Sequence, residues 1–181
     1  MAARYEQIAA WVNEFGWTTG VELGVFDGQS HFHLLQNCPN LTLVGIDLWG
    51  ESAPIEGKTK SGERCDCQYC NATRSSRRSK PIASIEQDAV KRSKSEPRSR
   101  LVKANTALSA DLVEQVDFVF VDGDHSFEGV KADISAWWPK VRYRLVGHDW
   151  NMRSVRDAVY ECFPDTEIAT GDDHLWWVSR G

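Results

Sequence analysis

The 181-residue sequence predicts an α/β fold: a Rossmann-like, doubly wound and mostly parallel sheet with an antiparallel last strand. Three observations lead to this prediction. Short apolar runs alternate along the chain with segments of helical periodicity, which is the pattern of β-α units. The run from Val116 to Val121 is nearly continuous, as expected for a strand buried on both faces of a sheet. Two strand patterns follow each other near residue 181, so the last strand has to turn back against its neighbour.

The first third of the chain opens with an amphipathic helix. Tyr5, Ile8, Val12 and Phe15 recur at helical spacing, and Gly16 follows as a C-cap. The elements expected next are, in order, a strand at Thr19–Gly24, a turn at Val25–Ser30, a helix at His31–Cys38 and a buried strand at Leu41–Asp47. One of these strands ends in a glycine and the other in a carboxylate, so both lead into turns that can face a ligand.

Residues 49–80 have little apolar periodicity and are rich in glycine, proline, serine and basic residues. We therefore predict one domain over residues 1–181 with a loop inserted at about 50–80. Three cysteines in this loop, Cys65, Cys67 and Cys70, are a candidate zinc site. A fourth ligand is not evident, so an ordinary cysteine-containing loop is the alternative.

Beyond this loop the alternation of helices and strands resumes. Ile82, Ile85 and Ala89 share one helical face, and Pro139 stops a later helix. The expected elements are a helix from about Pro81, strands at Arg100–Ala104 and Val116–Val121, a helix at Phe127–Trp137, a strand at Leu145–Asp149, a helix at Val155–Cys162, and strands at Thr166–Ala169 and Leu175–Val178.

Composition and charge exclude several classes of protein. No apolar run approaches the roughly 20 residues that cross a bilayer, and residues 1–6 lack a signal-peptide core, so we expect a cytoplasmic protein. The five cysteines are an odd number and do not suggest a secreted disulfide framework. Residues 56–100 hold 12 basic and 6 acidic side chains, which leaves 9 and 20 for the rest of the chain. This basic segment is either a solvated surface or a lid over an acidic site.

Polar side chains gather where the predicted strands end. The carboxyl ends of parallel strands in an α/β sheet line the ligand-binding crevice. Acidic residues and glycine stand at four of these ends: Glu22 and Gly24, Asp47, Asp122 and Asp124, and Asp149. His125 adds an imidazole directly after the central strand. Helix capping by Asp124 or Ser126 explains one of these side chains, but not the whole group.

The turn after the first strand indicates the kind of cofactor. A dinucleotide fingerprint needs Gly-x-Gly-x-x-Gly, but starting from Gly24 the second and third positions are Phe26 and Gln29. Asp47 follows Gly24 by 23 residues, a spacing that suits a carboxylate on ribose hydroxyls. The pattern favours a cofactor that carries ribose and lacks a pyrophosphate.

Two stretches carry a resemblance to a known family. Residues 21–30, VELGVFDGQS, resemble motif I of class I S-adenosylmethionine-dependent methyltransferases. Residues 119–133, VFVDGDHSFEGVKAD, followed by Trp137-Trp138-Pro139 and Gly147-His148-Asp149-Trp150, are similar to the macrocin and novobiocic acid O-methyltransferases of methyltransferase family 24. The resemblance covers nearly the whole chain except residues 50–80. It implies a seven-stranded sheet with a reversed last strand.

The resemblance also implies roles for individual residues. The cofactor S-adenosylmethionine would be bound by the turn after the first strand, the end of the second and the residues after the third: Glu22, Gly24, Phe26, Gly28, Ser30, Asp47, Leu48, Asn105 and Thr106, together with Asp122. Asp122 and Asp149 match positions that bind a divalent metal, with Mg²⁺ the expected ion. Asp124 matches a proposed general base, and His125 and His148 are alternatives as base or ligand.

One departure from the family pattern concerns the metal. Metal-dependent relatives often carry a second carboxylate or amide directly after the position of Asp149, whereas this chain has Trp150 and then Asn151. Asn151, His148 or water would have to complete the shell. Without a metal, Asp124 or a histidine would take the acceptor's proton.

The expected activity is methylation of a hydroxyl group on a small-molecule acceptor, with no membrane or nucleic-acid partner and with a homodimer as one allowed assembly. Two other functions are compatible with the fold: a nucleotide- or NAD-binding oxidoreductase, which Phe26 in the fingerprint disfavours, and a non-catalytic cofactor-binding module.

Overall fold

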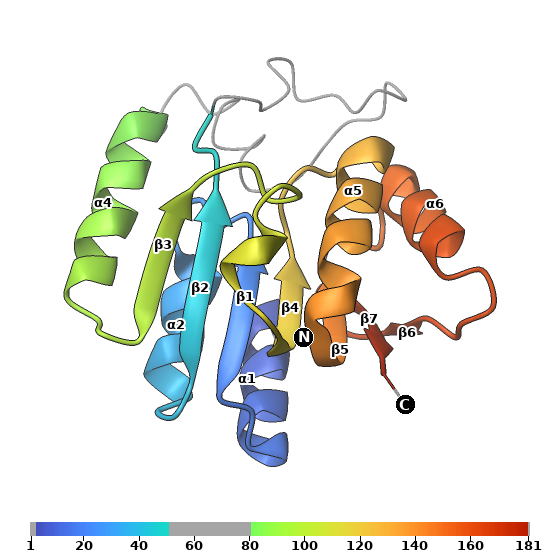
Figure 1. Cartoon of the computed structure of the whole chain (residues 1–181), viewed down its shortest axis with the longest axis horizontal. Coiled ribbons are helices and arrows are strands. Elements are labelled where there is room, and N and C mark those ends of the chain that lie inside the picture. The colour runs from blue at the N-terminus through green and yellow to red at the C-terminus, as the bar shows by residue number, and fades with distance from the viewer. Residues whose placement is uncertain (1–2, 51–80, 181) are drawn as a thin grey trace.

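The structure is a computed structural model that describes residues 3–50 and 81–180 (Figure 1). Residues 51–80 lie outside the described part. The predicted loop, its role as a lid and the candidate zinc ligands Cys65, Cys67 and Cys70 therefore stay predictions.

A seven-stranded sheet forms the centre of the molecule, which confirms the predicted fold class. The strands follow the order β3-β2-β1-β4-β5-β7-β6. Pairing is parallel from β3 to β5 and antiparallel for β7 against β5 and β6. The strands are β1 Thr19–Leu23, β2 Thr42–Asp47, β3 Ser99–Lys103, β4 Val116–Val121, β5 Val141–Gly147, β6 Ala169–Thr170 and β7 Trp176–Ser179.

Helices cover both faces of this sheet. They are α1 Arg4–Phe15, α2 Gln29–Asn37, α4 Ile82–Lys94, α5 Phe127–Trp137 and α6 Arg153–Cys162, with single 3₁₀ turns η1 Ala110–Leu112 and η2 Trp138–Lys140. The apolar stripes of α1 and α2 pack on one face, and those of α5 and α6 pack on the other (Figure 1). None of the described helices is long and apolar enough to cross a membrane.

The burial of the central strand β4 on both faces explains why its sequence is almost continuously apolar. Phe118 and Phe120 point into the core beneath α1 and α2, whereas Val119 and Val121 point into the core beneath α5 and α6. All six residues of β4 are buried, so both faces of the strand need apolar side chains.

Asp117, the one acidic residue in β4, lies near the amino end of this strand. Its Oδ2 accepts hydrogen bonds from the backbone amides of Thr18 and Thr19 at 2.8 and 2.9 Å, and its Oδ1 accepts one from Arg142 at 2.8 Å. Burial acts to raise the pKa of Asp117, but these hydrogen bonds outweigh it and lower the pKa. Asp117 thus ties β4 to the start of β1 and to β5.

Two strands differ from the prediction by more than one residue at an end. The strand predicted at Thr166–Ala169 is reduced to β6 at Ala169–Thr170, because only these residues pair with β7. The strand predicted at Leu145–Asp149 begins earlier, at Val141, and ends at Gly147. His148 and Asp149 therefore belong to the loop after β5, which frees their side chains from the pleat of the sheet.

Candidate active site at the carboxyl edge of the sheet

The ends of β1, β4 and β5 lie side by side. Leu23 pairs with Val121, and Val121 pairs with Gly147, so Gly24, Asp122 and His148 follow three adjacent strands at one level. Gly24 has a φ of 91°, and a Cβ at this position would overlap the carbonyl oxygen of Asp122. Only glycine allows the turn after β1 to pass so close to the end of β4.

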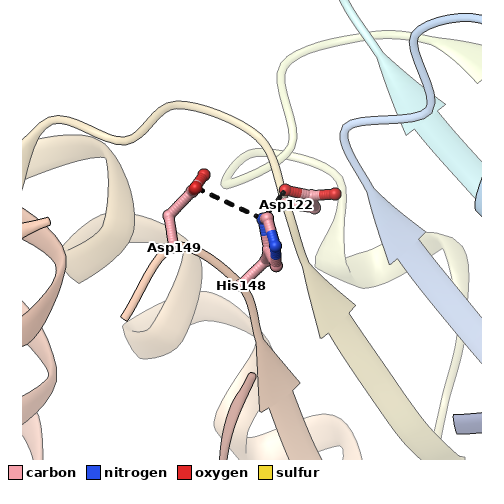
Figure 2. Close-up of side chains that lie close together, drawn as sticks. All are labelled: Asp122, His148 and Asp149. Carbon is pink, nitrogen blue, oxygen red and sulfur yellow. Dashed lines mark ion pairs between the residues drawn. The ribbon is translucent and has the colours of Figure 1, made fainter. Parts of the chain in front are cut away.

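Three side chains converge at this edge (Figure 2). His148 Nδ1 lies 3.3 Å from Asp122 Oδ1 and 3.4 Å from Asp149 Oδ1. One ligand atom from each of the three residues lies within 4.8 Å of the others. We call Asp122, His148 and Asp149 the acidic cluster.

The backbone around Asp149 is held in an uncommon conformation. Asp149 has a φ of 57°, in the left-handed region that residues other than glycine seldom adopt. Neighbouring hydrogen bonds hold it there: Met152 N donates to Asp149 O at 2.8 Å, and Trp150 N donates to His174 O at 3.0 Å. Such strain is common where a side chain has to be aimed at a ligand.

Two more residues contact the acidic cluster. His125 Nε2 lies 2.7 Å from Asp149 Oδ2 and 3.7 Å from Asp122 Oδ1. From the other side, Arg4 Nε donates to Asp122 Oδ2 at 3.2 Å. The sequence analysis identified His125 but missed Arg4, which lies 118 positions from its partner and belongs to no motif.

Opposite charges set the protonation states within the cluster. Burial by itself lowers the pKa of His148, but hydrogen bonds and charge from Asp122 and Asp149 outweigh it and raise the pKa to about 9. Burial acts to raise the pKa of Asp149 and Asp122, yet the two imidazoles lower both, with Arg4 adding to the effect on Asp122. With no ligand bound, His148 is therefore a cation between two carboxylates at neutral pH.

The acidic cluster also fits a divalent cation. Two carboxylates and an imidazole are ligands that Mg²⁺, Mn²⁺ or Zn²⁺ accept, and the first two ions favour oxygen-rich sites. The nitrogen-to-oxygen separations of 3.3 and 3.4 Å are close to the roughly 3 Å between neighbouring ligands of an octahedral shell. His148 thus stands where the third ligand was missing from the sequence pattern.

The expected base Asp124 lies outside the acidic cluster. Its Oδ1 accepts a hydrogen bond from Ser126 N at 2.9 Å, and its side chain packs against Gly129 at the start of α5. Ser126 is the N-cap, because its Oγ accepts from Gly129 N at 3.1 Å. The structure brings His125, rather than Asp124, against the cluster.

The turn between β1 and α2 is built around Asp47. Phe26 N donates to Asp47 Oδ2 at 2.8 Å, and Trp49 N donates to Asp47 Oδ1 at 2.6 Å. Burial nevertheless raises the pKa of Asp47. Phe26 and Gly28 have φ values of 51° and 78°, so the turn is sharp at both positions. Asp47, followed by Leu48, thus holds the turn expected to receive the cofactor.

Glu22 and Ser30, at the two ends of this turn, are buried and do not reach its surface. Glu22 is 1% exposed, and its Oε2 lies 3.1 Å from His31 Nδ1. Burial raises the pKa of Glu22 despite that contact. His31 Nε2 in turn lies 2.9 Å from Ser99 Oγ. Glu22, expected among the cofactor-binding residues, therefore belongs to a buried Glu-His pair next to this turn.

The expected cofactor-binding residues Asn105 and Thr106 follow β3. Asn105 Oδ1 accepts from Leu108 N at 3.2 Å, and Thr106 Oγ1 donates to Asp133 Oδ1 at 2.6 Å. Asp133 is buried in α5, and burial raises its pKa to about 7. Its Oδ2 has no hydrogen-bond partner within the described residues. The sequence analysis missed Asp133, which is signalled only by its position on the apolar face of α5.

Comparisons with known proteins agree with this architecture. A family 24 model described as a methyltransferase domain matches residues 21–150. A comparison with curated proteins finds no match.

Similar solved structures include a putative caffeoyl-CoA O-methyltransferase from Staphylococcus aureus, with 13% identity, 100% of this chain and 85% of that chain covered, and a TM-score of 0.65. An O-methyltransferase from Bacillus cereus in complex with SAH has 13% identity, 98% and 80% coverage, and a TM-score of 0.61. An rRNA methylase from Streptococcus thermophilus has 11% identity, 99% and 96% coverage, and a TM-score of 0.60. At these identities the likeness concerns the fold.

Proposed function

Since this chain belongs to methyltransferase family 24 and is an S-adenosylmethionine-dependent methyltransferase, we propose that it methylates a hydroxyl group of a small-molecule acceptor. The acidic cluster beside the Gly24 turn carries this proposal. Together with His125, which contacts it, the cluster places charged and proton-accepting groups at the edge of the sheet at which α/β proteins bind ligands. The family match favours this activity over the oxidoreductase and the non-catalytic module.

The cofactor is proposed to lie across the ends of β1 and β2. The turn from Gly24 to Gly28 gives close access to the backbone, and Asp47 supplies carboxylate oxygens for the ribose hydroxyls. Asn105 and Thr106 are proposed on the adenine side. Methyl transfer is a displacement at the sulfonium carbon, so the protein has to align the acceptor oxygen and remove its proton.

We assign proton removal to His125. Its Nε2 lies 2.7 Å from Asp149 Oδ2, so Asp149 can orient the ring and stabilise its charged form after proton transfer. Asp124 is engaged with the start of α5, and His148 lies between Asp122 and Asp149 as a candidate cation ligand, so His125 is the remaining side chain of the three for this role.

A divalent cation would be held by Asp122, His148 and Asp149 and would lower the pKa of the acceptor hydroxyl. His148 would have to lose its proton before it could bind a cation. Cation binding is therefore expected to strengthen as the pH rises. The cytoplasmic location and the homodimer stay predictions of the sequence.

The test measures S-adenosylhomocysteine release with S-adenosylmethionine and a panel of phenols, catechols and sugar hydroxyls, with tRNA and rRNA transcripts as separate samples. Asp149→Asn is compared with Asp157→Asn, whose side chain is 53% exposed on α6. We expect turnover on small hydroxyl compounds, a loss of at least 100-fold in Asp149→Asn and none in Asp157→Asn. Turnover on RNA alone would contradict the acceptor class. Full activity after exhaustive chelation would contradict the metal.

A further inference from the structure

Arg4, the first residue of α1, contacts two segments at the carboxyl edge of the sheet. Its Nε donates to Asp122 Oδ2 at 3.2 Å. Its backbone N donates to Asp173 Oδ2 at 2.9 Å, and its Nη1 lies 3.7 Å from the same oxygen. Asp173 belongs to the turn between β6 and β7. The guanidinium is thus held between the end of β4 and this turn.

Most of the hydrogen-bonding capacity of Arg4 is unused. A guanidinium has five N–H donors. Within the described residues, only the Nε–H of Arg4 makes a side-chain hydrogen bond; Nη1 lies 3.7 Å from Asp173 Oδ2 in an ion pair, and Nη2 has no partner there. The side chain is 15% exposed, so water reaches these donors only in part. A ligand carboxylate that replaces this water would meet a largely desolvated cation, at which charge-assisted hydrogen bonds are strong.

Arg4 lies close to the turn that is proposed to receive the cofactor. Asp122, which Arg4 contacts, has its backbone directly beneath Gly24. Tyr5, the neighbour of Arg4, accepts a hydrogen bond from Gln29 at the start of α2 at 3.4 Å. The first turn of α1 therefore borders both the glycine turn and the acidic cluster.

We propose that Arg4 binds a carboxylate group of a ligand through its two Nη groups while Asp122 fixes the guanidinium through Nε. This inference rests on the proposed function. The planar fork of an arginine matches a carboxylate, and two parallel N–H···O bonds give both strength and orientation. The nearby Asp122, Asp149 and Asp173 would repel an anion, so a bound carboxylate has to face Arg4.

A carboxylate at this edge has two sources. The methionine moiety of S-adenosylmethionine carries one, and an acceptor such as a hydroxybenzoate carries another. In either case Arg4 would set the direction from which the sulfonium methyl or the hydroxyl enters. It would do so by binding the carboxylate end of the ligand beside α1, away from the acidic cluster.

The experiment compares wild type, Arg4→Gln and Arg4→Lys by calorimetry with S-adenosylmethionine and with decarboxylated S-adenosylmethionine, which keeps the amine. Arg180→Gln is the matched control. It removes the same charge at the opposite edge of the sheet, where Arg180 Nη2 donates to Trp138 O at 2.8 Å. A second arm measures binding of 3,4-dihydroxybenzoate and of catechol to protein saturated with S-adenosylhomocysteine.

If the cofactor supplies the carboxylate, Arg4→Gln weakens S-adenosylmethionine binding at least tenfold and leaves the decarboxylated compound unchanged. If the acceptor supplies it, Arg4→Gln weakens 3,4-dihydroxybenzoate binding tenfold and leaves catechol unchanged. Arg4→Lys, which keeps the charge but not the fork, should lose part of the affinity. It also serves as the test variant if Arg4→Gln fails to fold.

Unchanged binding of both carboxylated ligands in folded Arg4 variants would overturn the inference. Equal weakening of the carboxylated and decarboxylated ligands would overturn it as well, because Arg4 would then act through Asp122 alone. Wild-type protein that binds no S-adenosylmethionine would instead refute the proposed function, so the two failures are distinguishable.

Discussion

Replacing Asp133 by asparagine should raise the free energy of unfolding above that of wild type, and this gain should be larger at neutral pH than at acidic pH. Asp133 lies in α5 with 1% of its surface exposed. It accepts one hydrogen bond from Thr106, and its Oδ2 has no partner in the described part of the chain. Asparagine has nearly the same shape, keeps an oxygen for Thr106 and cannot ionise, so it resembles the protonated form of Asp133.

The magnitude follows from the pKa. Burial, which is the largest cause, raises the pKa of Asp133 from 3.8 to about 7. Between these values the folded chain holds a proton that the unfolded chain has lost, so the free energy of unfolding falls as the pH rises. At 1.36 kcal/mol per pH unit, ionisation of Asp133 costs about 4 kcal/mol by pH 7. Below pH 4 the cost disappears.

Urea unfolding of wild type and Asp133→Asn at several pH values from 4.5 to 7.5 measures this cost. Because other titrating groups are common to both proteins, the difference in unfolding free energy isolates residue 133. We expect this difference to grow with pH in favour of Asp133→Asn and to level off above about pH 7. The exposed control Asp157→Asn should show no such trend. A difference that stays constant over the whole range would refute the reasoning.

Three further substitutions test the site and its support. Gly24→Ala places a methyl group against the carbonyl oxygen of Asp122, so binding of S-adenosylhomocysteine should be lost and the melting temperature lowered, as calorimetry and thermal melts would show. Asp117→Ala leaves two partly buried backbone amides and Arg142 without their acceptor and should cost about 2 kcal/mol in urea unfolding; a loss below 1 kcal/mol would contradict its role. Asp47→Ala removes a charged acceptor that is expected to hold the ribose, worth about 1.5–3 kcal/mol per hydrogen bond, so cofactor affinity should fall at least tenfold; unchanged affinity by calorimetry would exclude the ribose assignment.

The fold was predictable because burial on both faces leaves a strong local pattern. The apolar run of β4 and the carboxylates after β4 and β5 located both the central strand and the edge that carries the cluster. β6 was predicted less well, because its two residues are defined by pairing with β7 rather than by their own pattern.

The parts of the site that sequence reasoning missed depend on tertiary contacts. Arg4 reaches Asp122 only because α1 docks against the sheet, and no feature of residues 3–6 indicates this. Glu22 matches the motif, but its burial against His31 depends on the packing of α2 over β1. In the sequence Asp133 looks like an ordinary polar helix residue, and only the fold shows that Thr106 donates a hydrogen bond to it.

The anchoring of Arg4 has a consequence for how the protein matures on the ribosome. Its contact with Asp122 spans 118 positions of sequence and its contact with Asp173 spans 169, so the second cannot form until the β6–β7 turn has been synthesised and has left the ribosomal exit tunnel. Contacts between such distant positions also carry a loop-closure cost that has to be met before they form, which slows folding. Nascent chains that end before Asp173 should therefore expose an unfinished cofactor site. Cofactor present during translation would then stabilise the completed chain and not its precursors.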